Sequence, residues 1–262
     1  MANTSNETTG DTPRDVVRLM VDLILAPDAH AKGTVERSIY DPTAGTGGPL
    51  STGEDRTRET GDTLLADKQA GTTFDYCLSN PPFGADWRKQ QREVTEEHKR
   101  RGFAGRFGAG LPRTSDSSML YLMHLISKMR EASDGAAGGR AAIVLGGSPL
   151  FTGGAGSGES NIRKWVLDND YLEAIVALPS DLFYNTGIAT YIWVLSKDKA
   201  PERQNKVQLI DGSTLLHTMD KAIGSKRNEL TKADIDQIVT IYGAFEDRDR
   251  SKVLPREAFY YR

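Results

Sequence analysis

The feature that most constrains the fold of this chain is a regular alternation of strand-like and helix-like segments. Short runs rich in β-branched and aromatic residues, typical of buried strands, are separated by segments whose apolar residues recur at helical spacing. The sequence predicts strands at 37–42, 74–79, 140–147, 171–178, 189–197 and 206–212. It predicts helices at 12–27, 117–132, 160–170 and 231–245. This order predicts an α/β fold with a doubly wound, mostly parallel sheet, in which the later strands adjoin each other without an intervening helix.

Composition sets further limits. With 262 residues, of which 38% are apolar, the chain is long enough for a single α/β domain. We expect residues 1–11 to be a polar, disordered lead and residues 12–262 to form that domain. No apolar run approaches the 18 residues of a membrane span, so the sequence predicts a soluble cytoplasmic protein without membrane contact. The single cysteine, Cys77, excludes an internal disulfide and a multi-cysteine metal site, and we expect it to be a buried strand residue.

The first predicted helix carries clear boundary signals. Thr12 is placed to cap it, Pro13 suits the first helical position, and Asp15 lies in the first turn. The apolar residues that share one helical face are Val16, Leu19, Met20, Leu23 and Ile24. We expect that face to be buried.

A glycine-rich motif follows the first predicted strand, and in a doubly wound sheet ligands bind outside the carboxyl ends of the strands. It reads DPTAGTGG, residues 41–48, where Gly45, Gly47 and Gly48 allow close backbone approach and leave N–H groups for a carboxylate or phosphate. The motif lacks the GK[ST] ending of a phosphate-binding loop and the GxGxxG spacing of a dinucleotide site, which disfavours nucleotide hydrolysis. A plain tight turn is the alternative interpretation.

The second motif is NPPF, residues 80–83, which follows the run FDYCLS. Pro81 and Pro82 can neither donate to a sheet nor continue a helix, so they hold Asn80 and Phe83 in a stiff, extended turn. The Asn80 side-chain oxygen and a proline carbonyl can accept both hydrogens of an exocyclic amine, which favours a tetrahedral nitrogen that can attack an electrophilic methyl group. The Phe83 ring can stack on a planar base drawn out of its helix. The alternative is a proline-stiffened loop with a buried Phe83.

Together the two motifs resemble those of S-adenosylmethionine-dependent N6-adenine DNA methyltransferases, and more closely those of the modification subunit of type I restriction–modification systems. Four further stretches are similar to that family, so the resemblance covers nearly the whole chain: TPRDVVRLMVDLIL, SDSSMLYLMHLISKMR, GSPLFTGGAGSGESNIRKW and LPSDLFYNTGIATYIWVLSK. The resemblance implies a Rossmann-like methyltransferase fold, S-adenosylmethionine as cofactor and DNA as substrate. It also implies a DNA-specificity subunit and a restriction subunit as partners.

The resemblance assigns roles to the matching positions. It implies that Thr12, Pro13 and Arg14 lie by the methionine end of the cofactor. The turn that it implies for cofactor binding comprises Asp41, Pro42, Thr43, Gly45, Thr46, Gly47 and Gly48. Asp62 resembles the acid that contacts the adenine ring of the cofactor, although a turn residue after Gly61 is the alternative. The segment Asn80–Phe83 would hold the target adenine.

One departure from the family is a short connection. Only 31 residues lie between Gly48 and Asn80, whereas a helix, a strand, a second helix and the next strand with their loops need roughly 50 residues. We therefore expect a helix–strand–helix portion to be absent, together with the acidic residue that grips the cofactor ribose. Glu54 and Glu59 lie in the remaining connector, which has no strand character, and we expect neither to replace that acid.

The absent portion would leave the strand before Asp41 at an unpaired edge of the sheet. We expect residues around Gly61–Leu65 to occupy part of the vacant position, or a second copy of the chain to cover the edge as a homodimer. Either way we expect weak cofactor binding and slow or absent methylation. Smaller departures are Thr9–Asp11 in place of aromatic residues and Gly146 in place of asparagine, and we expect the family's flanking helical regions to be absent or truncated.

A net charge of −3 argues against DNA binding by bulk charge, but one segment is basic. Residues 86–113, directly after NPPF, carry eight Lys or Arg against four Asp or Glu. Within them, RRGFAGRFGAGLPR interleaves arginines with Phe103 and Phe107, which suits phosphate contact and base stacking. We expect a solvated charged helix at 90–99. The expected DNA-contacting residues are Arg100, Arg101, Arg106 and Arg113.

Three hypotheses remain open. The first is a type I DNA adenine-N6 methyltransferase core. The second is another S-adenosylmethionine enzyme, one that methylates a protein glutamine or an RNA base, and the matches after residue 114 argue against it. The third is a degenerate fragment that keeps subunit or DNA contacts without catalysis, which the 31-residue gap supports.

Overall fold

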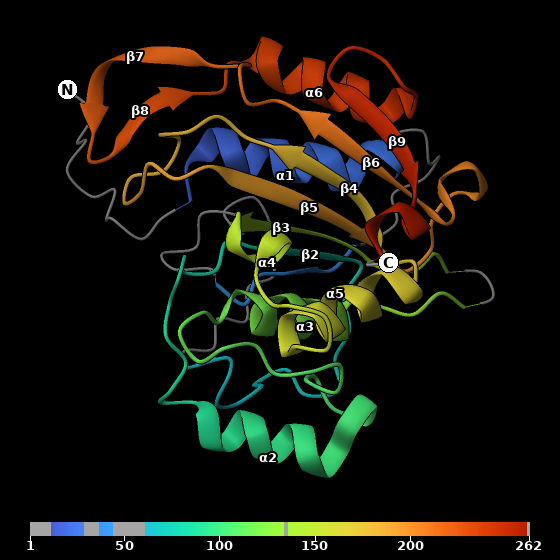
Figure 1. Ribbon diagram of the computed structural model, residues 1–262. Coiled ribbons are helices and arrows are strands. Elements are labelled where there is room, and N and C mark those ends of the chain that lie inside the picture. The colour runs from blue at the N-terminus through green and yellow to red at the C-terminus, as the bar shows by residue number, and fades with distance from the viewer. Residues whose placement is uncertain (1–11, 29–36, 44–60, 134–135, 261–262) are drawn as a thin grey trace.

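The computed structural model describes residues 12–28, 37–43, 61–133 and 136–260, and a seven-stranded sheet forms its centre (Figure 1). In spatial order the strands are β1 (Ile39–Tyr40), β2 (Tyr76–Ser79), β3 (Arg140–Gly146), β5 (Thr190–Ser196), β4 (Leu172–Ala177), β6 (Lys206–Asp211) and β9 (Ser251–Pro255). Strands β1, β2, β3, β4 and β6 run in one direction, whereas β5 and β9 run against them. The predicted mostly parallel sheet is confirmed, and Cys77 is a fully buried residue of β2, as expected.

Helices cover both faces of the sheet, as a doubly wound fold requires. Helices α1 (Arg14–Leu25) and α6 (Lys232–Ala244) lie on one face, where α1 packs against β3 and α6 against β6. Helices α3 (Ser118–Lys128) and α5 (Gly158–Asp168) lie on the other face (Figure 1). Successive residues of the central strands point into opposite cores: Val144 packs in the core under α1, and Ile143 packs in the core under α3.

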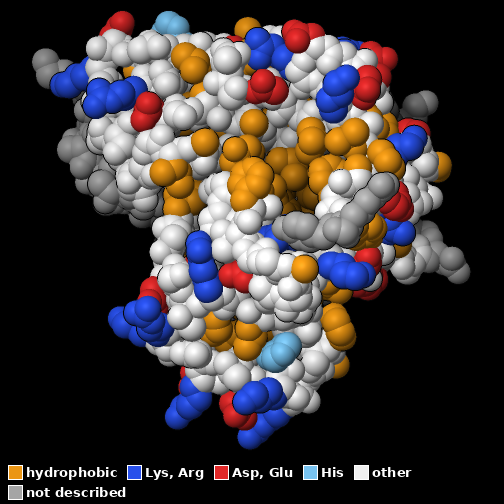
Figure 2. Space-filling view, viewed as in Figure 1, with side chains coloured by type: hydrophobic (Ala, Val, Ile, Leu, Met, Phe, Trp, Pro, Cys, Tyr) orange, Lys and Arg blue, Asp and Glu red, His pale blue; other side chains and the backbone are white. Residues whose placement is uncertain are grey.

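The remaining elements are short or peripheral. Helix α2 (Gln91–Arg101) buries Val94 and is otherwise polar, and Figure 2 shows Lys and Arg side chains gathered at the lower end of the molecule, where α2 lies. Helix α4 (Ser148–Phe151) follows β3, and a separate hairpin pairs β7 (His217–Ile223) with β8 (Lys226–Glu229). Short 3₁₀ turns are η1 (Ala26–Asp28), η2 (Gly102–Ala104), η3 (Pro201–Arg203) and η4 (Arg256–Phe259). Within the described ranges, no helix is long and apolar enough to cross a membrane.

The buried face predicted for the first helix is confirmed, but the predicted cap is wrong. All five apolar residues of that face are buried, namely Val16, Leu19, Met20, Leu23 and Ile24. The helix begins at Arg14 with Pro13 as its N-cap residue, and no side chain of the described residues caps it. Thr12 does not cap the helix because its hydroxyl accepts a hydrogen bond from the side chain of Asn80.

The connection between β1 and β2 adds no paired strand in its described part. Residues 61–75 form turns, loops and one isolated bridge, and β1 is the edge strand of the described sheet. The sheet nevertheless has seven strands, because β6 and β9 extend it at the edge opposite β1. The replacement expected at Gly61–Leu65 is not a strand: this segment forms a turn, and the Thr63 hydroxyl donates to the Pro42 carbonyl at 3.1 Å.

Candidate functional site

The two sequence motifs meet at one edge of the sheet. Asp41 follows β1 and Asn80 follows β2, and these strands are parallel neighbours in which Tyr40 pairs with Cys77. Parallel neighbours end at the same edge, so both motifs lie at the carboxyl edge, where doubly wound folds bind their ligands.

Thr43 joins the two motifs through its hydroxyl group. Thr43 Oγ1 donates to Asp41 Oδ1 at 2.9 Å and accepts the backbone N–H of Asn80 at 2.9 Å. The Thr43 backbone N–H also donates to Asp41 Oδ1, at 2.7 Å, and the Ser79 hydroxyl lies 3.2 Å from Thr43 Oγ1. Asp41 therefore fixes Thr43, and Thr43 fixes the backbone at Asn80.

The side chain of Asn80 has one satisfied end and one unsatisfied end. Its Nδ2 donates to Thr12 Oγ1 at 3.0 Å. Its Oδ1 is buried and has no hydrogen-bond partner among the residues that the structure describes. A buried carbonyl oxygen without a donor costs free energy, so such atoms in native proteins call for an explanation, and a ligand that donates a hydrogen bond is one.

The rest of the NPPF turn is partly ordered by packing. Pro81 is buried and Pro82 is exposed. The Phe83 ring is half-buried and meets the Phe183 ring edge-on, with the centroids 5.3 Å apart and the planes at 80°. This contact fixes one side of the Phe83 ring, which packs against the core under α1 and keeps exposed surface, so its stacking role stays a prediction.

Asp41 is an acid in an unfavourable place for a negative charge. Burial raises its pKa from 3.8 to about 6, and the two hydrogen bonds from Thr43 oppose part of that rise. Among the described residues, Asp41 forms no ion pair. A cationic ligand group beside this carboxyl would favour its ionised form.

The other residues expected to bind a cofactor are only partly described. Pro13 is buried and Arg14 is exposed at the start of α1, whereas Pro42 presents its carbonyl to Thr63. The glycine-rich part of the turn, Gly45–Gly48 with Thr46, lies outside the described residues. The contribution expected of these glycines therefore stays a prediction.

Asp62 has the contacts of a turn residue. Its Oδ1 accepts the backbone N–H groups of Leu64 at 3.0 Å and Leu65 at 3.3 Å, and its Oδ2 accepts the Gln90 side-chain amide at 2.6 Å. These bonds favour the turn interpretation, and they leave Oδ2 with an acceptor site beside its bond from Gln90.

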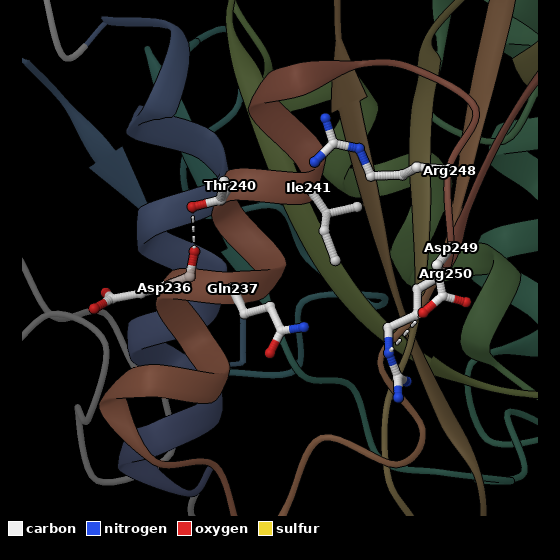
Figure 3. A pocket seen from close by; sticks show the side chains of 7 residues that line it. All are labelled: Asp236, Gln237, Thr240, Ile241, Arg248, Asp249 and Arg250. Atoms are coloured by element: carbon white, nitrogen blue, oxygen red, sulfur yellow. Dashed lines mark hydrogen bonds and ion pairs between the residues drawn. The ribbon is translucent and has the colours of Figure 1, made fainter.

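A surface pocket of about 360 Å³ lies elsewhere, between α6 and the turn before β9 (Figure 3). Its lining residues are Asp236, Gln237, Thr240, Ile241, Arg248, Asp249 and Arg250. None of them belongs to the motifs at the carboxyl edge, so this pocket does not mark the candidate site. Across the described ranges, no three His, Cys, Asp or Glu side chains form a group that could hold a metal ion.

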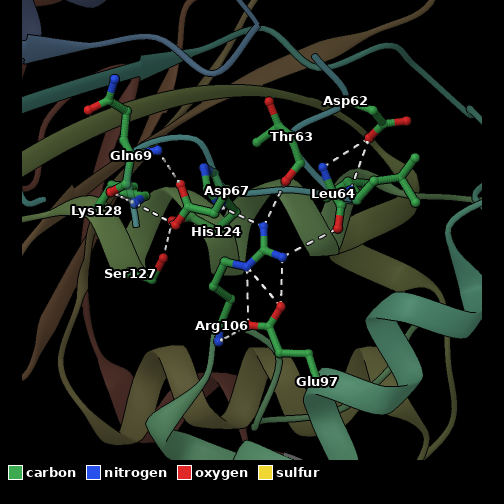
Figure 4. Close-up of polar contacts among 11 residues, drawn as sticks. Asp62, Thr63, Leu64, Asp67, Gln69, Glu97, Arg106, His124, Ser127 and Lys128 are labelled. Atoms are coloured by element: carbon green, nitrogen blue, oxygen red, sulfur yellow. Dashed lines mark hydrogen bonds and ion pairs between the residues drawn. The ribbon is translucent and has the colours of Figure 1, made fainter. Parts of the chain in front are cut away.

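Arg106 lies in a buried polar cluster and not on the surface (Figure 4). Its guanidinium donates to both carboxylate oxygens of Glu97, to Oε2 at 2.6 Å, and its side chain is only 11% exposed. It also donates to the carbonyls of Thr63 at 2.7 Å and Leu64 at 3.3 Å. The structure contradicts the expected DNA contact of Arg106, because these acceptors occupy its donors inside the protein.

The residues around Arg106 are also structural. Phe107, expected to stack on bases, is fully buried, with the Arg106 guanidinium 4.5 Å from its ring centroid. His124 Nδ1 lies 3.3 Å from Arg106, and His124 Nε2 lies 2.9 Å from the Tyr40 hydroxyl. Burial, and then the charge of Arg106, lower the pKa of His124 to about 3, so this ring is neutral near pH 7.

The other arginines expected to contact DNA remain at the surface. The side chain of Arg100 is 80% exposed and pairs with Glu96 on α2, and Arg101 is exposed at the end of the same helix. Arg113 is about half exposed and donates to the Ser148 hydroxyl at 2.8 Å. Their expected DNA contacts stay a prediction.

Comparison with known proteins identifies the family of this chain. The model of the family described as N-6 DNA Methylase matches residues 51–257, a range that includes Asn80–Phe83. The chain belongs to this family. Because the match covers most of the sequence, including β2 to β9, the assignment does not depend on the NPPF motif alone.

Similar proteins come from type I restriction enzymes. The MjaIX methylase subunit of Methanocaldococcus jannaschii is 26% identical over 281 residues, which cover 92% of this chain and 46% of the relative. The MjaVIII methylase subunit of the same organism is 32% identical over 178 residues, which cover 67% of this chain and 27% of the relative. A solved methyltransferase subunit of a type I restriction–modification system from Streptococcus thermophilus shares the fold, with a TM-score of 0.75 at 24% identity over 95% of this chain and 56% of that one. The chain therefore spans about half or less of the length of these proteins.

Sequence reasoning missed three contributions to the site. It did not predict that Thr12 binds the Asn80 side chain, that Thr43 binds the Asn80 backbone, or that Phe183 supports Phe83. Thr43 and Phe183 lie within stretches that carry the family resemblance, which was the only available signal for them. Thr12 carried a competing signal, since threonine before proline at the start of a helix is typical of a cap.

Proposed function

We propose that this chain is the catalytic core of a DNA methyltransferase that modifies the N6 amino group of adenine, using S-adenosylmethionine as methyl donor. The observation that carries the proposal is the buried, unpartnered Oδ1 of Asn80 at the carboxyl edge of the sheet. Membership of the N-6 DNA methylase family supports it independently.

The chemistry follows from what Asn80 can accept. The lone pair of an aromatic amino nitrogen is delocalised into the ring, so the nitrogen is a poor nucleophile. Asn80 Oδ1 would accept one N–H of the adenine amine, and the Pro81 carbonyl would accept the other. These bonds draw the nitrogen towards a tetrahedral shape and return its lone pair to it. Phe83, and Pro82 beside it, would hold the base in place, with Phe83 stacking on the base face.

When bound, S-adenosylmethionine supplies a methyl group activated by the positive sulfur. Asn80 and Pro81 would hold the amine so that its nitrogen could bond to the methyl carbon as the carbon–sulfur bond broke, and the nitrogen would then lose one proton to water. No strong base is required, because the alkylated nitrogen is a strong acid. The contribution of the protein is to position the amine and to hydrogen-bond it.

Part of the described site fits a cationic cofactor. Asp41 is a half-buried residue whose carboxyl has a raised pKa, and an ammonium group beside it would favour its ionised form. We propose that Thr12, Pro13, Arg14, Asp41, Pro42 and Thr43 line this end of the cofactor site together with Gly45, Thr46, Gly47 and Gly48. Asp62 would contact the cofactor through the acceptor site that its Oδ2 keeps beside the bond from Gln90.

A second candidate, a subunit without catalysis, is favoured by one specific observation. Apart from Asp41, the carboxylates described in the connection between β1 and β2 are all bonded within the protein. Asp67 pairs with Lys128, Asp75 accepts bonds from Ser38 and pairs with Arg130, and Asp62 holds its turn. None of these three is free to bind a ribose, so we propose that affinity for the cofactor is weak.

The proposed partners follow from the relatives, which are named as methylase subunits of type I restriction enzymes. We propose that residues 12–262 act as one catalytic domain within a complex that contains a DNA-specificity subunit and a restriction subunit. Arg100, Arg101 and Arg113 would contact DNA phosphates. A DNA-modifying role places the complex with the DNA, in the cytoplasm. A homodimer that covers the edge at β1 belongs to the same proposal.

The function is tested by substituting Asn80. Asn80→Ala should abolish transfer of labelled methyl groups from S-adenosylmethionine to adenine in DNA, with the partner subunits present, because the acceptor Oδ1 is lost. Cofactor binding measured by calorimetry should be largely unchanged. Asn161→Ala, on the exposed surface of α5, is the matched control and should retain wild-type activity. Methylation by Asn80→Ala at the wild-type rate would refute the assignment, and a wild-type complex that binds DNA without methylating it would favour the non-catalytic candidate.

A further inference from the structure

Asn80 is held by hydroxyl groups from two separate parts of the chain. Thr43, after β1, accepts the Asn80 backbone N–H, and Thr12, 68 residues away, accepts the side-chain Nδ2–H. The first bond fixes the backbone and the second fixes the amide group itself. The orientation of the amide decides whether its oxygen or its nitrogen faces the substrate.

We propose that Thr12 is a positioning residue for methyl transfer, which orients the Asn80 amide so that Oδ1 is presented to the amino group of the target base. The proposal rests on the proposed function of Asn80. It gives Thr12 a task at the base-binding side of the site, distinct from contact with the methionine end of the cofactor.

The use of the Thr12 hydroxyl supports this role. A threonine directly before a helix ordinarily caps it. Here Pro13 occupies the N-cap position and no side chain caps α1. The Thr12 hydroxyl is turned instead to Asn80 Nδ2 at 3.0 Å, while Asn80 Oδ1 stays buried without a donor.

Thr12 is also attached to a rigid support. The residue before a proline is restricted to extended conformations, and Pro13 is itself buried. Helix α1 is anchored close by, because Asp15 accepts a bond from the Leu230 backbone N–H at 2.8 Å and pairs with Lys226 at 3.1 Å. A hydroxyl held in this way can fix a partner side chain with little loss of entropy on substrate binding.

The amide orientation has a chemical consequence for the substrate. With Nδ2 committed to Thr12, the group left for the ligand is an acceptor. An exocyclic amine such as N6 of adenine can donate to it. A ring carbonyl, such as O6 of guanine or O4 of thymine, cannot. Thr12 thereby contributes to the choice of an amino base.

The test uses two substitutions of Thr12 in the full chain. Thr12→Val keeps the β-branched shape and removes the acceptor, whereas Thr12→Ser keeps the hydroxyl and serves as the matched control. In ¹⁵N-labelled protein, the side-chain amide signal of Asn80 is assigned by its loss in Asn80→Ala. Thr12→Val should speed exchange of that amide with water by about three- to tenfold, as expected for one lost neutral hydrogen bond, and Thr12→Ser should not.

The kinetic arm uses the complex with its partner subunits. At saturating S-adenosylmethionine, Thr12→Val should slow single-turnover methylation by about tenfold while the KM for DNA stays near wild type, and Thr12→Ser should restore the rate. The proposal is overturned if amide exchange in Thr12→Val matches wild type, or if Thr12→Ser is as slow as Thr12→Val. If the wild-type complex does not methylate DNA, the proposed function fails, and the exchange measurement alone decides whether Thr12 orients the amide.

Discussion

Replacing Arg106 should destabilise the protein strongly, although its place in a basic segment suggested a surface residue. Its guanidinium, 11% exposed, faces the Glu97 carboxylate, 15% exposed, with bonds to both oxygens. It also satisfies the carbonyls of Thr63 and Leu64. Arg106→Met keeps the apolar length of the side chain and the backbone N–H that Glu97 accepts at 2.8 Å, but it removes the cation beside that carboxylate and the donor of two carbonyls.

The magnitude follows from the burial of the pair. Removing one partner of a buried, hydrogen-bonded ion pair costs about 3–5 kcal/mol, far above the 0–1 kcal/mol of an exposed pair. We expect about 3 kcal/mol, since Glu97 is not completely enclosed and water can reach it after the change. Glu97→Gln in the same background should recover about 2 kcal/mol, because the uncompensated charge is then gone.

The assay is equilibrium unfolding in urea for the four members of this double-mutant cycle. Arg92→Met, which removes an arginine that is 86% exposed beside Glu93, is the control and should change stability by under about 0.5 kcal/mol. Burial alone would raise the pKa of Glu97, but the hydrogen bonds and charge of Arg106 hold it below its usual value of 4.5. The pair therefore stabilises the protein fully above pH 4.5, and its contribution is lost as the pH falls through the lowered pKa. A cost under about 1 kcal/mol for Arg106→Met, or additive effects in the cycle, would refute the reasoning.

Two further predictions concern the site itself. Burial raises the pKa of Asp41 from 3.8 to about 6, so the stability associated with its neutral form is full below pH 3.8 and is lost as the pH rises through 6. Asp41→Asn should therefore be more stable than wild type at pH 7.5, by up to about 3 kcal/mol, and this gain in stability should vanish below pH 4. Thermal unfolding at both pH values measures the difference, and an equal difference at the two would contradict the raised pKa of Asp41. Phe83→Ala should weaken methylation of DNA by about tenfold or more through loss of stacking, whereas Phe83→Tyr should retain most of it; equal single-turnover rates for the two variants would exclude a stacking role.

The central architecture could be predicted from the sequence because buried elements leave a periodic trace. All seven residues of β3 are buried, and the apolar run Ala141–Leu145 marks such a strand. The hairpin of β7 and β8 has no such trace. Six of the seven residues of β7 are exposed and none is buried, so neither apolar alternation nor an apolar run indicated a strand there.

The candidate site was only partly predictable for a related reason. Two consecutive prolines restrict their own backbone, so the stiff turn at Asn80 could be read locally. The partners of Asn80 could not, since a hydrogen bond to Thr12 spans 68 residues and leaves no pattern in either segment. The DNA contact predicted for Arg106 rested on a count of charges in residues 86–113, and such a count does not show which arginine pairs with an acid inside the protein. Arg106 pairs with Glu97, nine residues before it, and is therefore buried.

In the described part of the short connection between β1 and β2, Arg and Lys side chains bond the backbone in place of a neighbouring strand. Carbonyl groups that a strand would pair with its neighbour are bonded here by side chains: Arg106 takes those of Thr63 and Leu64, and Lys128 takes that of Gln69 (Figure 4). The Leu64 side chain is buried in the core under α3, so this segment also contributes apolar packing. Because β1 ends immediately before Asp41, and Thr63 bonds the Pro42 carbonyl next to it, the same contacts hold the carboxyl edge on which Thr43 and Asn80 depend. Arg106 is thus used for the integrity of the site, and we expect phosphate contacts only from the exposed arginines Arg100, Arg101 and Arg113.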